Sequence, residues 1–254
     1  MITLISPSNT MNSSDADLKL PQSNPIFDHE AELIAQKMSK LSIEQLEQTL
    51  HLSHDLALVN NDRYLNFDNG KYPPKQAILS YAGSVYRNID LHTMNQASLE
   101  YLQAHVLIIS SLYGLLRPFD LIKPYRINFH LKIDSIPGKD LYEFWRMKIT
   151  DQLNSLAIKD DGIIINLTSK EVEHVIDTKA MSRKVQFIKV EFKENKGDGK
   201  FLSERAYAKP AEGNLIDYIT RNQLNSSADL KLFTWNGYVY NSELSNNKEY
   251  VFTR

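Results

Sequence analysis

Residues 162–167 place three consecutive isoleucines between a glycine and an Asn-Leu pair, and this run constrains the fold more than any other stretch of the chain. A short apolar run of this kind, rich in β-branched residues, predicts a strongly buried strand. Residues 1–6 and 106–110 have the same apolar character and also predict strands. Segments with helical patterns separate these runs, so strands and helices alternate through the first two thirds of the chain.

The predicted helices begin at recognisable signals. Asp28 is positioned to cap a helix whose apolar residues include Leu33 and Ile34, and residues 42–45 form a capping-box pattern that opens a second helix ending near residues 60–61. Residues 7–28 contain three prolines and predict a loop. Further helices are expected over residues 98–104, 141–156 and 212–222, and a further strand over residues 76–81.

The last third of the chain has the sequence pattern of β-hairpins. Residues 185–192 alternate polar and apolar side chains, a turn follows at 196–200, and residues 201–208 return. The pair Asn236-Gly237 predicts a second hairpin. We therefore expect a mixed α/β fold: a single compact domain over residues 1–254 with a mixed sheet, flanking helices and C-terminal β-hairpins.

Composition excludes several classes of function. The chain has no cysteine, so disulfides, thiolate metal ligands and thiol peroxidase chemistry are excluded. The net charge of −2, from 29 basic and 31 acidic residues, argues against polyanion binding through global charge. The short apolar start, without a preceding basic residue, predicts a strand and not a signal peptide, and the other apolar runs are too short to span a membrane. We expect a cytoplasmic protein.

Several stretches together resemble the YaaA peroxide-stress family. They fall in the family's order at residues 4–7, 76–79, 112–126, 138–145 and 207–209. The resemblance implies a compact α/β domain, survival of hydrogen peroxide by limiting unincorporated iron, and DNA binding through a helix-hairpin-helix element and a basic cleft. No agreed enzymatic reaction comes with the family, and we expect no cofactor.

The chain departs from the family pattern at charged positions. Asn9 stands where the family usually has lysine, Ser84 where it has aspartate, and Asn128 where it has glutamate. Pro210 and Glu212 replace two cations of a basic Tyr-Ala-Lys-Lys-Ala-Arg-Gly stretch. The chain therefore resembles a divergent member, and we expect weaker DNA binding than the family pattern implies.

Residues 117–148 are the best candidates for phosphate or nucleic-acid contact. This window has seven basic and four acidic residues with aromatic residues interleaved, which suits backbone neutralisation and base stacking. Its turn at 135–139 could be the hairpin of a helix-hairpin-helix element, or an ordinary turn in which Asp140 caps the next helix. The alternative for the window is a solvated helix face with core aromatics. The candidates are Arg117, Lys123, Tyr125, Arg126, Gly138, Lys139 and, outside the window, Lys209.

Polar residues at the ends of two predicted strands are candidates for a ligand pocket. Ser6 and Thr10 follow the first strand, and Asn166, Ser169 and Glu171 follow the strand at 162–167. Groups at the carboxyl ends of strands often line ligand crevices, although capping and turn formation are the alternative use. Tyr113 completes the candidate pocket set. No metal site is expected, because His51 and His54 lack a complete set of partner ligands.

The sequence thus favours a peroxide-stress protection protein that limits iron-driven damage and binds DNA weakly and without sequence preference through a local basic region, or that binds a phosphate-bearing small molecule. One alternative is an enzyme acting on a small phosphorylated or nucleoside-like substrate, with Ser6, Asn166 and Glu171 in the pocket and Arg126 as the anion anchor. Another is a paralogue whose polar site has decayed. A deep pocket would favour the enzyme, an open basic groove would favour DNA, and a flat neutral surface would favour decay.

Overall fold

A computed structural model describes residues 1–12, 18–134 and 136–254 of the chain. Its centre is an eight-stranded sheet in the order β4-β3-β1-β6-β7-β10-β9, with β8 paired to β7. β3, β1, β6, β7 and β10 run parallel, whereas β4, β9 and β8 are antiparallel to their neighbours. The strands are β1 (Ile2–Ile5), β3 (Val106–Ser110), β4 (Gly114–Leu116), β6 (Ile163–Asn166), β7 (Gln186–Asn195), β8 (Phe201–Leu202), β9 (Val239–Tyr240) and β10 (Glu249–Thr253). The mixed α/β fold expected from the sequence is confirmed.

The central strands are apolar at almost every position because they are buried along their whole length. Every residue of β1 and β3 is buried, and β1 pairs with β3 at Thr3↔Val106 and with β6 at Thr3↔Ile165. A strand in a parallel sheet with both faces covered reads as a continuous apolar run and not as an alternation. The three strongest strand predictions are confirmed for this reason.

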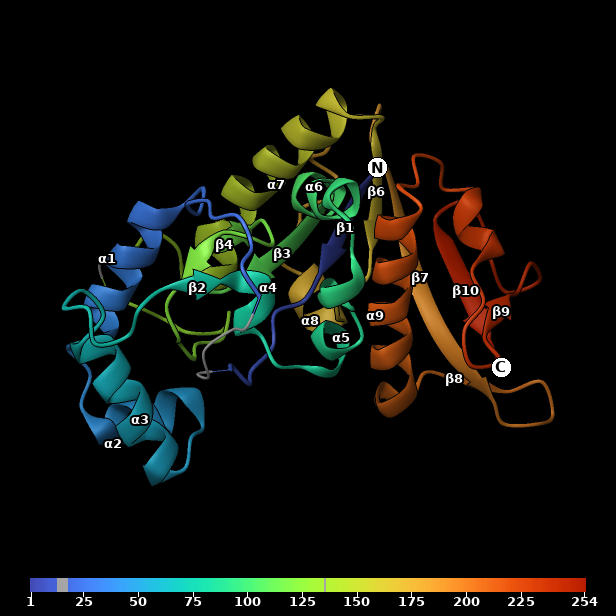
Figure 1. Ribbon diagram of the computed structural model, residues 1–254. Helices are drawn as coiled ribbons and strands as arrows, with labels where there is room; N and C mark the ends of the chain where they lie inside the picture. The colour runs from blue at the N-terminus through green and yellow to red at the C-terminus, as the bar shows by residue number, and fades with distance from the viewer. Residues whose placement is uncertain (13–17, 135) are drawn as a thin grey trace.

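The longer helices pack around the sheet, and a helical extension lies at one end of the molecule (Figure 1). α6 contacts β3, α7 contacts β4, and α9 contacts β7 and also α5. The helices are α1 (Asp28–Met38), α2 (Ile43–Leu50), α3 (His54–Leu65), α4 (Ala77–Ser80), α5 (Ser84–Arg87), α6 (Gln96–His105), α7 (Leu141–Lys159), α8 (Lys170–Glu173) and α9 (Arg205–Arg221). Two short strands, β2 (Lys75–Gln76) and β5 (Leu121–Ile122), form a separate antiparallel pair, and single 3₁₀ turns occupy Leu91–Thr93 and Asp229–Leu232. In the described residues no helix is long and apolar enough to cross a membrane.

The α1–α3 region corrects two predictions. Asp28 is the first residue of α1 and not its cap, since Phe27 precedes the helix without a side-chain cap. The helix predicted from residue 42 to 61 is two helices: His51 adopts φ 52°, ψ 51° and ends α2, and α3 begins after Ser53. The capping box at Ser42 and Gln45 is present as expected.

Two predicted strands are wrong. Residues 76–81 form only the end of β2 and then α4, whose buried residues Ala77, Ile78 and Ser80 suit a helix as well as a strand; periodicity cannot separate these possibilities in so short an apolar run. The return strand at 201–208 ends after Leu202, and α9 starts at Arg205, seven residues before the predicted helix. Pro210 lies inside α9.

Other predictions from turn chemistry are confirmed. Asn236 and Gly237 have φ 47° and 85°, and an antiparallel bridge joins Trp235 to Tyr238 across them. Positive φ at both central positions is the requirement of the tight hairpin turn that Asn-Gly favours. Residues 13–17 of the predicted loop and Ser135 of the predicted turn lie outside the described residues.

Candidate ligand site at the strand ends

The connections after β1 and β6 leave the sheet in opposite directions. β1 and β6 are parallel neighbours, but the chain next joins the sheet at β3 on one side of β1 and at β7 on the far side of β6. In open α/β sheets, ligands bind in the crevice outside the carboxyl ends of the strands at such a switch point. The topology therefore marks the ends of β1 and β6 as the first place to look for a site.

A cavity of about 540 Å³, which we call the strand-end cavity, lies at this point. Its volume falls within the range of roughly 300–1,000 Å³ that small-molecule sites occupy. Its walls come from the loop after β1, the start of α5, the end of β3, the segment before α7, the loop after β6 and the first turns of α9. The polar or charged lining residues are Ser6, Ser8, Asn9, Thr10, Ser84, Tyr86, Ser111, Asn128, Ser169, Glu171, Arg205 and Lys209.

The two strand-end loops are joined directly by hydrogen bonds. The Ser169 backbone N–H donates to Ser6 Oγ at 2.9 Å, and the Ser6 hydroxyl donates to Ser169 Oγ at 3.5 Å. Tyr86 fixes the same loop, because its hydroxyl donates to the Ser6 carbonyl at 2.7 Å. Ser169 also caps α8 by accepting from the Val172 N–H at 3.4 Å. Capping and pocket lining, which the sequence presented as alternatives, coincide at Ser169.

The start of α9 gives the cavity its positive wall. Arg205 and Lys209 are one turn apart and both line the cavity. Lys209 Nζ donates to both carboxylate oxygens of Glu212, at 2.7 and 2.9 Å, and these two side chains are only 19% and 13% exposed. Burial raises the pKa of Glu212 to about 7, although the positive charge of Lys209 opposes this rise. Within the described chain, no hydrogen bond or ion pair holds the Arg205 guanidinium.

Close backbone contacts hold the cavity walls together. A Cβ atom on Gly213 would lie 2.3 Å from the Val85 carbonyl oxygen, so the glycine allows α9 to pack directly on α5. A Cβ on Gly83 would lie 2.8 Å from Ser8 Oγ, so α5 also approaches the loop after β1 closely. On the opposite wall, the buried Oδ1 of Asn128 has no hydrogen-bond partner among the described residues. Buried acceptors of this kind are usually satisfied by the protein or by ordered water.

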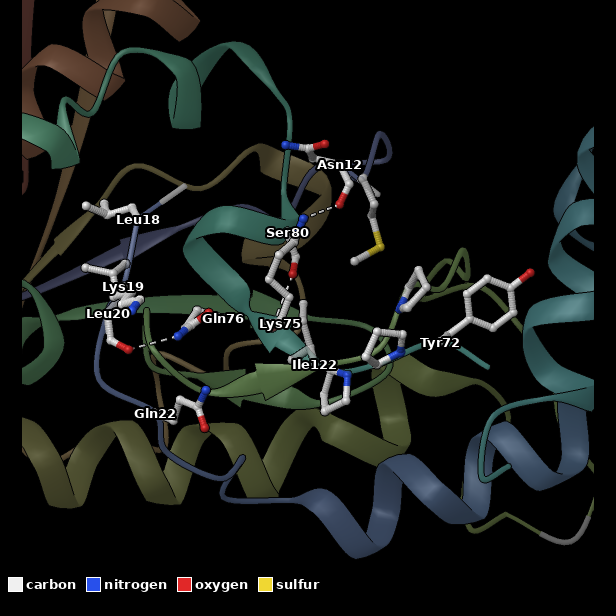
Figure 2. Close-up of a pocket in the computed structure, with 14 residues that line it drawn as sticks. Asn12, Leu18, Lys19, Leu20, Gln22, Tyr72, Lys75, Gln76, Ser80 and Ile122 are labelled. Carbon is white, nitrogen blue, oxygen red and sulfur yellow. Dashed lines mark hydrogen bonds between the residues drawn. The ribbon is translucent and has the colours of Figure 1, made fainter. Parts of the chain in front are cut away.

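A second cavity, of about 570 Å³, lies beside β2 and is lined by residues that flank the stretch 13–17 (Figure 2). Its polar groups are bonded to its own walls. Gln76 Nε2 donates to the Leu20 carbonyl at 3.1 Å, and the Asn12 N–H donates to the Ser80 carbonyl at 2.7 Å. These bonds tie β2 and α4 to the neighbouring loop.

Comparison with known proteins identifies the family. The family model described as "Peroxide stress protein YaaA" matches residues 1–244. This chain belongs to the YaaA family. A "UPF0246 protein" of Parabacteroides distasonis is 36% identical over 253 residues, covering 99% of both chains, and one from Francisella philomiragia is 35% identical over the full length of both. Another, from Clostridium perfringens, is 36% identical over 256 residues, again at full coverage.

The pocket residues predicted for this YaaA-family chain divide into two groups. Ser6, Thr10, Ser169 and Glu171 line the strand-end cavity. Asn166 is fully buried below it: its Nδ2 donates to Glu173 at 3.0 Å, and its Oδ1 accepts from the Thr168 hydroxyl at 2.7 Å. Tyr113 is also buried, and its hydroxyl accepts from the Lys123 N–H at 3.0 Å. Asn166 therefore supports the segment after β6 from the core, whereas Tyr113 lies outside the cavity lining.

Most predicted phosphate contacts have partners inside the protein. Arg117 forms an ion pair at 3.1 Å with the fully buried Asp120. Lys123 pairs with Asp68 at 3.3 Å and lies over the Phe67 ring.

Arg126 and Tyr125 also have partners within the protein. Arg126 donates to the Asn9 carbonyl at 3.1 Å, so it supports the loop after β1 from outside the cavity. The Tyr125 hydroxyl is buried between the hydroxyls of Tyr81 and Ser110, at 2.7 and 2.8 Å. Among the predicted anion contacts, only Lys209 reaches the strand-end cavity.

Of the two alternatives for the turn before α7, the structure supports the ordinary turn in which Asp140 caps the next helix. A helix follows the turn, because Asp140 accepts from the Glu143 N–H at 3.0 Å and caps α7. No helix precedes it in residues 123–134. Gly138 has φ 100°, and the Lys139 N–H donates to the Glu143 carboxylate at 2.7 Å, so a side chain of this protein already occupies the turn. In the described chain no group of three or more His, Cys, Asp or Glu residues could hold a metal ion.

Sequence reasoning missed the residues that depend on packing between distant segments. Arg205 escaped notice because residues 201–208 read as a strand, and Glu212 was noted only as a lost positive charge. A basic surface was also missed: a hollow of about 890 Å³ beside the start of β7 is lined by five basic and two acidic residues. Four of the five cations have no ion-pair partner within the described residues; they are Lys179, Arg183, Lys184 and Lys248.

Proposed function

We propose that this YaaA-family chain protects against peroxide stress by limiting iron-driven damage, and that it does so by binding a phosphate-bearing small molecule in the strand-end cavity. One observation carries the proposal. The loops after β1 and β6, hydrogen-bonded to each other, and the cationic start of α9 converge on one cavity at the topological switch point. Such a constellation suits an anionic ligand of metabolite size.

The lining favours binding over covalent chemistry. Ser6 is the best-placed hydroxyl, but the partners of its Oγ in the described chain are groups of Ser169. Nucleophilic catalysis needs a base within hydrogen-bond reach of the nucleophile. The polar lining and the unpartnered Asn128 Oδ1 also argue against a decayed site, since a decayed cavity would have no reason to keep them.

The proposal is tested by ligand binding together with survival of peroxide. Purified protein is titrated calorimetrically with a panel of nucleotides, sugar phosphates and inorganic phosphate. We expect at least one to bind, and Arg205→Ala to weaken it at least tenfold, whereas Lys40→Ala, an exposed cation elsewhere, leaves it unchanged. In cells that lack their own YaaA-family protein, the wild-type chain should lower chelatable iron and restore growth in peroxide, and Arg205→Ala should not. Restoration by Arg205→Ala as complete as by the wild type would contradict the proposal.

DNA binding is the second candidate, and the basic hollow beside β7 favours it. Its four unpaired cations are a better phosphate-binding surface than the 117–148 window, whose arginines and lysines are largely committed. Each neutralised phosphate adds about 0.9 to the salt slope, so about four contacts predict a loss of roughly 10² in affinity between 50 and 200 mM salt. In a mobility-shift assay, Arg183→Glu with Lys184→Glu should abolish binding while Lys139→Glu should not. The reverse pattern would return DNA binding to the turn before α7.

A further inference from the structure

The positive charge of Lys209 has two possible partners, an anion in the strand-end cavity and the carboxylate of Glu212. Its side chain lines the strand-end cavity, yet its ammonium group donates to both oxygens of Glu212, which lies one turn further along α9 and does not line the cavity. Glu212 is largely buried, and in the described chain Lys209 is its only hydrogen-bond partner. Arg205, one turn before Lys209, faces the same cavity without such a partner.

We propose that Glu212 competes with the bound anion for Lys209, so that the cavity takes up its anionic ligand together with one proton. This inference rests on the function proposed above, because it concerns the same cavity and the same class of ligand. It adds Glu212 as a residue that sets the affinity for the anion, and it adds one proton that binds together with the ligand. An anion in the cavity and an ionised Glu212 place two negative charges around one ammonium group, and protonation of Glu212 removes one of them.

The energetics favour protonation over coexistence of the two anions. A buried carboxylate loses its hydration, and only a well-placed partner compensates that loss. When a bound anion draws Lys209 toward the cavity, the ammonium group compensates the Glu212 carboxylate less well. Glu212 then becomes the group that takes up a proton. The pKa of Glu212 is already raised to about 7 by burial in the unliganded protein, so little free energy separates its two forms near neutral pH. By linkage, a ligand that favours the protonated form binds more tightly as the pH falls.

The surrounding charged groups leave Glu212 as the titrating residue. On α9 itself, Lys209 and Arg205 are the charges that act on its pKa. The titratable groups on the elements that contact α9 are Tyr86 and Arg87 on α5, Glu100, Tyr101 and His105 on α6, and Lys189, Glu191, Lys193 and Glu194 on β7. In the described chain, Lys209 is the one charged group that bonds to the Glu212 carboxylate. Glu171 faces the cavity from α8 and is exposed. It is therefore the matched control for a carboxylate in the site that lacks contact with Lys209.

The test uses inorganic sulfate, which resembles a phosphate group but does not itself titrate near neutral pH. Sulfate is titrated into wild-type protein by calorimetry at pH 6 and pH 8, in two buffers of different ionisation enthalpy. For a group that titrates near pH 7 and stays protonated in the complex, we expect affinity to fall about tenfold from pH 6 to pH 8, with net uptake of protons at pH 8. Glu212→Gln should bind with the same affinity at both pH values, and Glu171→Gln should keep the wild-type dependence.

The outcomes separate this inference from the proposed function. Sulfate binding with no pH dependence and no proton uptake in the wild type overturns the inference and leaves the ligand site standing. A Glu212→Gln variant that keeps the full pH dependence does the same. Absence of any sulfate binding at either pH, together with absence of binding by the phosphate panel, overturns both. Proton uptake is measured on the wild type, so the test does not depend on whether the variant folds, and thermal melting of Glu212→Gln checks its fold.

Discussion

Arg117 illustrates how a residue of the family motif can be committed to structure, and its removal gives a quantitative prediction. Asp120 is fully buried and accepts from Arg117 Nε and Nη2 at 3.2 and 3.1 Å. It also accepts from the Ser23 hydroxyl at 2.6 Å and from the Arg117 backbone N–H at 2.7 Å. Arg117→Ala therefore removes two of these four hydrogen bonds and leaves a buried carboxylate without its counter-charge.

The expected cost follows from that count. Breaking a buried ion pair by removing one partner costs about 3–5 kcal/mol. The Arg117 side chain is 39% exposed, which screens part of the attraction, and the two surviving donors still satisfy Asp120 in part. We therefore expect a loss of about 3 kcal/mol in the free energy of unfolding, at the lower end of the range. At about 2–4 °C per kcal/mol for a chain of this size, the melting temperature should fall by about 6–12 °C.

Urea denaturation at pH 7, followed by circular dichroism, measures this loss. Lys132→Ala is the matched control, since Lys132 is an exposed cation in the same basic window and should change stability by no more than about 0.5 kcal/mol. Arg117→Lys should fall between the two, because an ammonium group keeps the charge but cannot reproduce the two-pronged contact. An Arg117→Ala protein of wild-type stability that has lost DNA binding would refute the reasoning and restore Arg117 as a phosphate contact.

Three other predictions follow from the structure. The folded-state pKa of Glu212 is raised from 4.5 to about 7, so this group stabilises the protein fully below pH 4.5, and the stabilisation disappears as the pH rises through 7; in urea titrations, the loss of stability between pH 5 and pH 8 should be smaller in Glu212→Gln, by up to about 3 kcal/mol. Gly213→Ala should cost about 1–3 kcal/mol, because its Cβ would collide with the Val85 carbonyl; an unchanged melting temperature would show that α5 and α9 can separate without loss. Limited proteolysis should cut the exposed turn at 195–200 before the core, and two stable fragments of comparable size would contradict the single-domain prediction.

The sequence predicted those parts of the fold whose signals are local. The isoleucine run of β6 and the Asn236-Gly237 turn each have one favourable structure, because burial on both faces and positive φ leave few alternatives. The run at 76–81 has no such restriction, and its two-residue pairing with Leu121 and Ile122 is a long-range contact that no local pattern reveals. The start of α9 was missed for a related reason, because residues 201–208 have a strand-like pattern, and Pro210 stands inside the helix although it removes one backbone hydrogen bond.

The candidate site was predictable in part. Ser6 and Ser169 were found because polar groups after a strand are a local signal, but their hydrogen bond depends on β1 and β6 being neighbours. Arg117 and Lys123 were overestimated as ligand contacts because their partners, Asp120 and Asp68, become visible only when the chain is folded. Charge counted along a sequence window does not distinguish a cation that faces solvent from one that is paired.

The position of β1 between β3 and β6 has a consequence for how the chain folds. Thr3 pairs with Val106, 103 residues later, and Ile2 pairs with Ile164, 162 residues later. Both edges of β1 therefore pair with segments that lie far away in the sequence. Contacts of such sequence separation slow folding, because loop closure must precede the burial that rewards it. Until β6 is in place, β1 is a mostly apolar strand with an unpaired edge, which is the kind of segment that associates with other chains. We therefore expect refolding at high protein concentration to lose yield to aggregation, and the earliest segment of the chain to be the last to become protected from hydrogen exchange.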